Sequence, residues 1–123
     1  MTTVLDASAV LAYLGGETGA EAVGQALADG AVCSAANWSE VAQKALASGR
    51  DWTAAGRLLA SLGLKIEPVT RQDAEWAARR WRRGEGLSLA DRLCLALAAR
   101  LGAVALTADS AWGAGSGVSQ LRP

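Results

Sequence analysis

Two aspartates follow short apolar runs, each typical of a buried β-strand. Asp6 comes straight after the strand predicted over residues 2–5, and Asp109 lies just beyond the strand predicted over residues 103–107. In sheets of parallel strands, ligands bind beyond the carboxyl ends of the strands. Both carboxylates are therefore predicted to lie at one functional edge of a sheet.

A capping role is the alternative for each of these aspartates, since Asp is a favoured residue at helix N-caps. Ser8 and Ser110 follow them closely and offer hydroxyls that suit the same capping positions. The spacing alone leaves both roles open for Asp6 and Asp109.

Glu40 and Asp91 are two further acids near the starts of predicted helices. Asn37 precedes Glu40, and Ser88 precedes Asp91, at the spacing of a capping box. Glu40 lies nearly opposite the apolar stripe of its helix, which favours a solvated cap residue. Asp91 lies in the first turn of a helix that is apolar almost all round, where an unpaired carboxylate is costly. A metal or another cation would remove that cost.

Together, these four acids have the chemistry of a site for a hard divalent cation. Carboxylates about 5 Å apart repel by about 3 kcal/mol per pair at an effective dielectric constant of about 20. Such a cluster holds protons unless divalent cations neutralise it. Ligation by oxygen alone selects Mg²⁺ or Mn²⁺ over zinc. These ions activate water and stabilise the charge on a phosphodiester without any histidine.

The composition narrows the chemistry further, because the 123-residue chain has no histidine. This excludes Ser-His-Asp and Cys-His triads and zinc sites that need histidine. The 12 basic residues balance the 12 acidic ones, so nucleic-acid binding would require a local patch.

Most of the basic residues are arginine, whose planar guanidinium can donate two hydrogen bonds to one phosphate. The run over residues 79–83 reads either as a phosphate contact or as the solvated end of a helix, with Trp81 pointing inward. The candidate phosphate-binding residues are Arg79, Arg80, Arg82, Arg83 and Arg92.

Hydrophobic periodicity and turn residues predict the alternating elements that must position these side chains. Strands are predicted over residues 2–5, 31–34, 64–69, 103–107 and 118–121. Helices are predicted over residues 8–14, 36–48, 51–62, 70–83 and 88–100, with another opened by a Thr18–Glu21 capping box. The alternation predicts an α/β fold, in which a mostly parallel sheet of four or five strands carries helices on both faces. Residues 1–123 are expected to form a single domain.

The cysteines and the chain start bear on the cellular compartment. Cys33 and Cys94 each lie in an apolar segment and nothing marks secretion, so we expect two reduced, packed thiols. No charge-free run approaches the ~20 residues of a membrane span, and the first residues lack the pattern of a signal peptide. These features predict a cytoplasmic protein without membrane contact.

Four short motifs follow one another in order along nearly the whole chain. They are residues 4–14 (VLDASAVLAYL), residues 36–41 (ANWSEV), residues 87–91 (LSLAD) before a buried helix, and residues 106–109 (LTAD) followed by Trp112. Each motif is weak alone, but four in register are specific. Together they resemble the motifs of the PIN domain, and within it those of the VapC-type ribonuclease toxins of bacterial toxin–antitoxin pairs.

The resemblance implies a compact three-layer α/β/α PIN fold with Mg²⁺- or Mn²⁺-dependent endoribonuclease activity. It implies an RNA substrate, a homodimer and inhibition by a cognate antitoxin. The metal-binding and catalytic residues that it implies are Asp6, Glu40, Asp91 and Asp109.

The resemblance also implies roles within this set. Glu40, which the spacing favours as a cap, becomes a residue that binds a second ion or orients the attacking water, and the three aspartates become the main ligands. Ser8 and Thr107 would hydrogen-bond to the ligands. The neutral net charge departs from the basic surface from which an RNA-cutting enzyme often profits.

Two other functions fit an α/β domain with an acidic edge. A receiver-like phosphoacceptor domain would need paired acids after its first strand and a lysine after a late strand. Here Asp6 stands alone, and the lysines, Lys44 and Lys65, lie elsewhere. A non-catalytic member of the PIN fold that only binds a partner is the second alternative, and the presence of all four acids argues against it.

Overall fold

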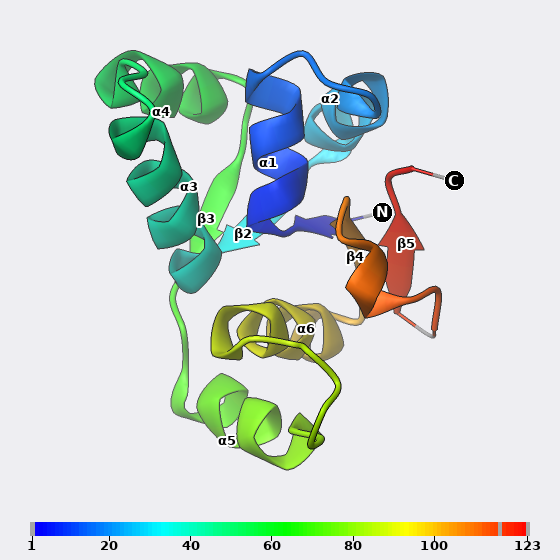
Figure 1. The fold of residues 1–123 in the computed structure, drawn as a ribbon. Helices are drawn as coiled ribbons and strands as arrows, with labels where there is room; N and C mark the ends of the chain where they lie inside the picture. The colour runs from blue at the N-terminus through cyan, green and yellow to red at the C-terminus, as the bar shows by residue number, and fades with distance from the viewer. Residues whose placement is uncertain (1, 116, 123) are drawn as a thin grey trace.

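The computed structural model describes residues 2–115 and 117–122, and within them a five-stranded sheet with helices on both faces (Figure 1). The strands are β1 (Thr3–Leu5), β2 (Ala31–Ser34), β3 (Lys65–Glu67), β4 (Val104–Thr107) and β5 (Val118–Gln120). The helices are α1 (Ala7–Leu14), α2 (Ala20–Asp29), α3 (Ala35–Ala47), α4 (Trp52–Ser61), α5 (Arg71–Arg80) and α6 (Leu89–Leu101), with a 3₁₀ turn, η1 (Ser110–Trp112). No helix of this part of the chain is long and apolar enough to span a membrane.

All strand pairs are parallel, in the order β3-β2-β1-β4-β5. Helices α1 to α4 lie on one side of the sheet and α5 and α6 on the other (Figure 1). The predicted three-layer α/β/α sandwich with a parallel sheet is therefore confirmed. Because β1, β2 and β4 are neighbours and run the same way, their carboxyl ends meet at one edge.

Side chains that alternate along the central strands divide the core in two, as the period of a strand requires. Those of one face pack with α1 to α4, and they include Leu5, Cys33 and Leu106. Those of the opposite face pack with α6, and they include Val4, Val32 and Ala105. This burial on both faces explains the short, continuous apolar runs of the three strands.

The start of α2 differs from the prediction. Its N-cap is Gly19, which makes no side-chain capping bond, so the Thr18–Glu21 capping box does not form. Gly19 has a φ of 96°, and a Cβ added to it would lie 2.4 Å from Cγ of Leu121. Both the backbone conformation and this close approach require glycine, and they fix how the chain enters α2.

Helix α5 ends earlier than predicted, and its buried face is different. The helix stops at Arg80, and Trp81 takes up an extended conformation in which it is 50% exposed rather than inward. Ala77 is buried, whereas Ala74 and Ala78 are exposed. The other buried residue of the helix is a charged one, Asp73, which is 3% exposed.

Asp73 joins α5 to α6 through a two-pronged ion pair with Arg100. The guanidinium donates to the two carboxylate oxygens at 2.9 and 3.1 Å, while Asp73 also completes a capping box with Thr70. Burial alone would raise the pKa of Asp73. The bonds from Arg100 and Thr70 outweigh burial, so the pKa is lowered.

We expect Asp73→Asn to lower the free energy of unfolding by about 2 kcal/mol at neutral pH, because it leaves a partly buried guanidinium unpaired. The lowered pKa means that the pair contributes above the ordinary carboxyl pKa, near 4, and is lost as pH falls through the folded-state value. Urea unfolding should therefore show a smaller difference in unfolding free energy between Asp73→Asn and the wild-type protein at pH 3 than at pH 7. Glu75→Gln, which loses only exposed pairs with Arg71 and Arg79, should cost less than about 1 kcal/mol.

Candidate functional site

Asp6 lies at the carboxyl end of the central strand β1 and is 3% exposed. Its Oδ1 accepts the Ala9 N–H at 2.8 Å, so Asp6 itself is the N-cap of α1 and Ser8 is not. The hydroxyl of Thr107 donates to Oδ2 at 2.6 Å, and that of Ser8 lies 2.8 and 2.9 Å from the two oxygens. The carboxylate is thereby held in one orientation by β4 and by the first turn of α1.

Electrostatics at Asp6 favour the protonated form. Burial raises the pKa of this carboxyl, and the hydrogen bonds from Thr107, Ala9 and Ser8 offset the rise only in part. The negative charge of Asp91 raises the pKa further. A cation at this edge would favour the ionised carboxylate over the protonated one.

Glu40 reaches the same neighbourhood through Asn37, whose role the sequence analysis missed. Helix α3 is capped by Ser34, so the predicted Asn37–Glu40 capping box does not form. Asn37 is instead 1% exposed, and its Nδ2 donates to Oε1 of Glu40 at 3.1 Å and to the Ala90 carbonyl at 3.2 Å. Glu40 is consequently half-buried and not a solvated cap.

A sequence signal for Asn37 did exist. Asn37, Val41 and Ala45 are the buried residues of α3, and they are spaced by four residues along one helix face. A polar residue at the head of an apolar stripe must bond inside the fold.

Asp91 forms the predicted capping box at the start of α6. Its Oδ2 accepts the Ser88 N–H at 2.9 Å, and its own N–H donates to Oγ of Ser88 at 3.1 Å. The side chain is half-buried. The negative charge of Asp91 also acts on Asp6, so one side chain both caps α6 and adds negative charge near the buried carboxylate.

Two buried cysteines are influenced by the charges of three of these acids. Burial raises the pKa of the Cys33 thiol to about 12, with the charges of Asp6 and Glu40 adding to the rise. The pKa of Cys94 is raised by burial and by the charges of Asp6, Asp91 and Glu40. Both cysteines are free and fully buried, as predicted. They lie beneath the acidic edge, which we define as Asp6, Glu40 and Asp91.

Asp109 is connected to this edge through its backbone. Its N–H donates to Oγ1 of Thr107 at 3.0 Å, the hydroxyl that also donates to Asp6. Its exposed carboxylate caps η1 by accepting the Ala111 N–H at 2.9 Å, so Asp109 and not Ser110 is the cap. Over residues 2–115 and 117–122, no three acid or cysteine side chains are arranged around a common metal position.

The predicted phosphate-binding arginines are mostly engaged within the protein. Arg80 forms a two-pronged pair with Glu85 at 2.7 and 2.9 Å, and this bonding, with the charges of nearby arginines, lowers the pKa of Glu85. Arg79 pairs loosely with Glu75 at 3.6 Å and stays 75% exposed.

The other three arginines surround the junction of α5 and α6. Nη1 of Arg92 donates to the Ala77 carbonyl at 2.7 Å, so Arg92 caps the end of α5. Arg82 donates to two backbone carbonyls at the helix end, and the guanidinium of Arg83 lies 5.6 Å from the centroid of the Trp81 ring.

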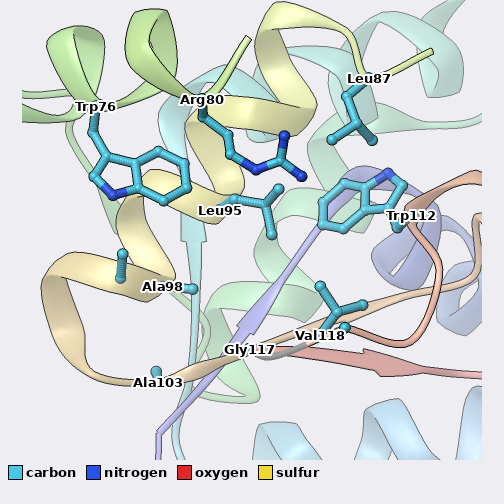
Figure 2. A pocket seen from close by; sticks show the side chains of 11 residues that line it. Trp76, Arg80, Leu87, Leu95, Ala98, Ala103, Trp112, Gly117 and Val118 are labelled. Atoms are coloured by element: carbon cyan, nitrogen blue, oxygen red, sulfur yellow. The ribbon is translucent and has the colours of Figure 1, made fainter. Parts of the chain in front are cut away.

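A cavity of about 400 Å³ lies between α5, α6 and the η1–β5 segment, away from the four acids. Figure 2 shows Arg80 extended across it between Trp76 and Trp112. The lining is largely apolar, with Leu87, Leu95 and Val118 among its residues, and the buried Nε1 of Trp112 has no hydrogen-bond partner in the described structure. The cavity holds none of the candidate acids and so does not change the assignment of the site.

Comparisons with known proteins agree with the geometry. Among curated proteins, none matches the chain significantly. Solved structures with a similar fold include a toxin–antitoxin complex from Klebsiella pneumoniae, with a TM-score of 0.76 at 21% identity over 97% of both chains. The Sarcin-Ricin loop cleaving toxin VapC20 of Mycobacterium tuberculosis has a TM-score of 0.65 at 18% identity, covering 88% of this chain and 90% of that one.

A third similar structure is PAE2754 from Pyrobaculum aerophilum, with a TM-score of 0.68 at 20% identity over 98% of this chain and 90% of that one. At these identities the structures show a shared fold. The model of one family, the PIN domain, matches residues 3–114, which include all four acids. The chain belongs to the PIN domain family.

Proposed function

We propose that this protein is a Mg²⁺- or Mn²⁺-dependent endoribonuclease and the toxin of a toxin–antitoxin pair. The observation that carries the proposal is the buried carboxylate of Asp6 at the carboxyl end of β1, on which the negative charge of Asp91 acts. Membership of the PIN family supports it, as does likeness in fold to a toxin–antitoxin complex and to a Sarcin-Ricin loop cleaving toxin. The family match also removes the receiver-like alternative.

The donor set fits a hard divalent cation. Every candidate ligand is an oxygen, and the carboxylates oppose one another's ionisation unless a cation joins them. The capping bonds use Oδ2 of Asp91 and Oδ1 of Asp109, so each keeps a second oxygen for an ion. Oδ1 of Asn37, buried near Glu40 with no partner in the described structure, adds another hard oxygen.

Each residue of the edge has a separable task. Asp6 would hold the ion in a fixed place, because β1, α1 and β4 together fix its carboxylate. Asp91 and Asp109 would complete the ligand set, and Glu40, fixed by Asn37, would bind a second ion or orient the attacking water. When bound, such ions activate water and stabilise the charge on the phosphodiester.

The proposal extends to the partners of the chain. The substrate is RNA, the active form is a homodimer of single-domain subunits spanning residues 1–123, and a cognate antitoxin inhibits it. The likeness in fold to a toxin–antitoxin complex supports the antitoxin, and co-purification with the product of a neighbouring gene tests it.

Asp6→Asn should reduce RNA cleavage by at least about 100-fold, because metal stabilisation of the reacting charge is worth several kcal/mol. The fold should persist, since the asparagine oxygen can still cap α1. Mapping cut ends on total RNA and circular dichroism measure the two effects. Asp51→Asn makes the same change at the α4 cap, outside the acidic edge, and should cleave normally. Full activity in Asp6→Asn would contradict the proposal.

Mn²⁺ should raise the melting temperature of the wild-type protein and not that of Asp6→Asn. An ion at 100 times its dissociation constant stabilises the folded state by about 2.7 kcal/mol. Differential scanning fluorimetry at constant ionic strength measures this without any activity, and EDTA should reverse it. Equal shifts in both proteins would place the ion elsewhere.

Thr107→Val should move the acidic limb of the cleavage–pH profile to higher pH. The Thr107 hydroxyl lowers the pKa of Asp6 against the effect of burial, so its loss raises that pKa further. Because only the ionised carboxylate binds a cation well, more alkaline conditions are then needed. We also expect a fall of roughly 10-fold in the rate at neutral pH. Thr53→Val, an exposed change on α4, is the control, and an unmoved profile in Thr107→Val would argue against this role.

A further inference from the structure

Trp81 is an exposed tryptophan in a chain that otherwise covers its indoles. Of the five tryptophans, Trp112 is buried and Trp38, Trp52 and Trp76 are half-buried, whereas Trp81 is 50% exposed. This exposure follows from the end of α5, where the backbone of Trp81 is extended with φ −61° and ψ 135°. The indole is therefore turned away from the core that its helical spacing would have given it.

The charges beside this indole are positive. The guanidinium of Arg83 lies 5.6 Å from the ring centroid, a cation–π distance, and Trp81 as a whole is still 50% exposed with that guanidinium in place. Nη1 of Arg82 is fixed by two backbone carbonyls at 2.9 and 3.0 Å. Neither Arg82 nor Arg83 forms an ion pair with the described acids, although Arg80 does.

The same helix end is joined to the start of α6. The Trp81 N–H bonds to the Ala78 carbonyl, and the Ala77 carbonyl accepts Nη1 of Arg92 instead. Arg92 immediately follows Asp91 of the acidic edge. The end of α5 is thus tied to the turn of α6 that carries a candidate metal ligand.

We propose that Trp81, Arg82 and Arg83, the Trp81 surface, bind single-stranded RNA, with one unpaired base stacked on the indole and the arginines contacting the flanking phosphates. This rests on the proposed function and deepens it by assigning the surface that holds an unpaired stretch of the RNA. An exposed indole beside two arginines that form no ion pair with the described acids matches the two parts of such a ligand, a flat base and a charged backbone. A paired base within a duplex has no free face for the indole.

Binding can be measured without cleavage in the Asp6→Asn background. The probe is a fluorescein-labelled, unstructured RNA of about 12 nucleotides, followed by anisotropy. We expect Trp81→Ala to weaken binding roughly 10-fold, as loss of one stacked base does, and Trp81→Phe to retain most of the affinity. Arg83→Ala should reduce the salt dependence by about one phosphate contact.

Controls separate stacking from general damage. Leu46→Ala removes another exposed apolar side chain, on α3, and should leave affinity unchanged. All variants should melt near the parent temperature, because Trp81 is exposed. A duplex of the same sequence should bind weakly and without dependence on Trp81. Affinity that Trp81→Ala leaves unchanged would overturn the RNA assignment and point to a protein partner.

The test also distinguishes this inference from the proposed function. Wild-type protein that cuts no RNA, while Trp81-dependent binding of the probe persists, would refute the nuclease and keep the Trp81 surface. Wild-type protein that cuts RNA, while Trp81→Ala binds and cuts equally well, would keep the nuclease and refute the surface.

Discussion

The buried carboxylate of Asp6 is the charge on which the rest of the acidic edge depends. Burial disfavours its ionised form, and the hydroxyls of Thr107 and Ser8 and the Ala9 N–H offset that cost only in part. Glu40 and Asp91 add negative charge in the same neighbourhood, above two thiols whose ionisation they suppress. A site so short of positive charge is suited to a divalent cation, and the parallel order of β2, β1 and β4 is what assembles it.

The sequence was sufficient for the features that depend on local pattern. Apolar runs buried on both faces predicted the parallel sheet, and the run before Asp6 predicted that this aspartate follows a buried strand, as it does at the end of β1. Trp81 was predicted to point inward but is exposed, for a physical reason that residue spacing cannot reveal. Trp81 continues the helical face of Ala77, but Arg92 from α6 takes the Ala77 carbonyl and the helix ends. Asn37 and Asp73 were missed likewise, because their partners lie in other elements.

The zero net charge conceals an uneven distribution of paired and unpaired charges over the chain. Arg80 is paired with Glu85, Arg100 with Asp73, and Arg71 with Glu75. Helix α5 contributes to each of these pairs. Arg82 and Arg83, beside Trp81, form no ion pair with the described acids, so a neutral chain can still present a local attraction to phosphate.

The strand order also governs when the site is completed during synthesis. Asp6 and Thr107 are separated by 101 positions in the sequence but joined by one hydrogen bond, between strands that are neighbours in the sheet. A chain emerging from the ribosome therefore carries Asp6 long before the residue that orients it has been made. Strand β1, at the centre of the sheet, can pair with β4 only after β4 has been synthesised. The hydrogen bond that orients Asp6 can therefore form only after residue 107 has been made.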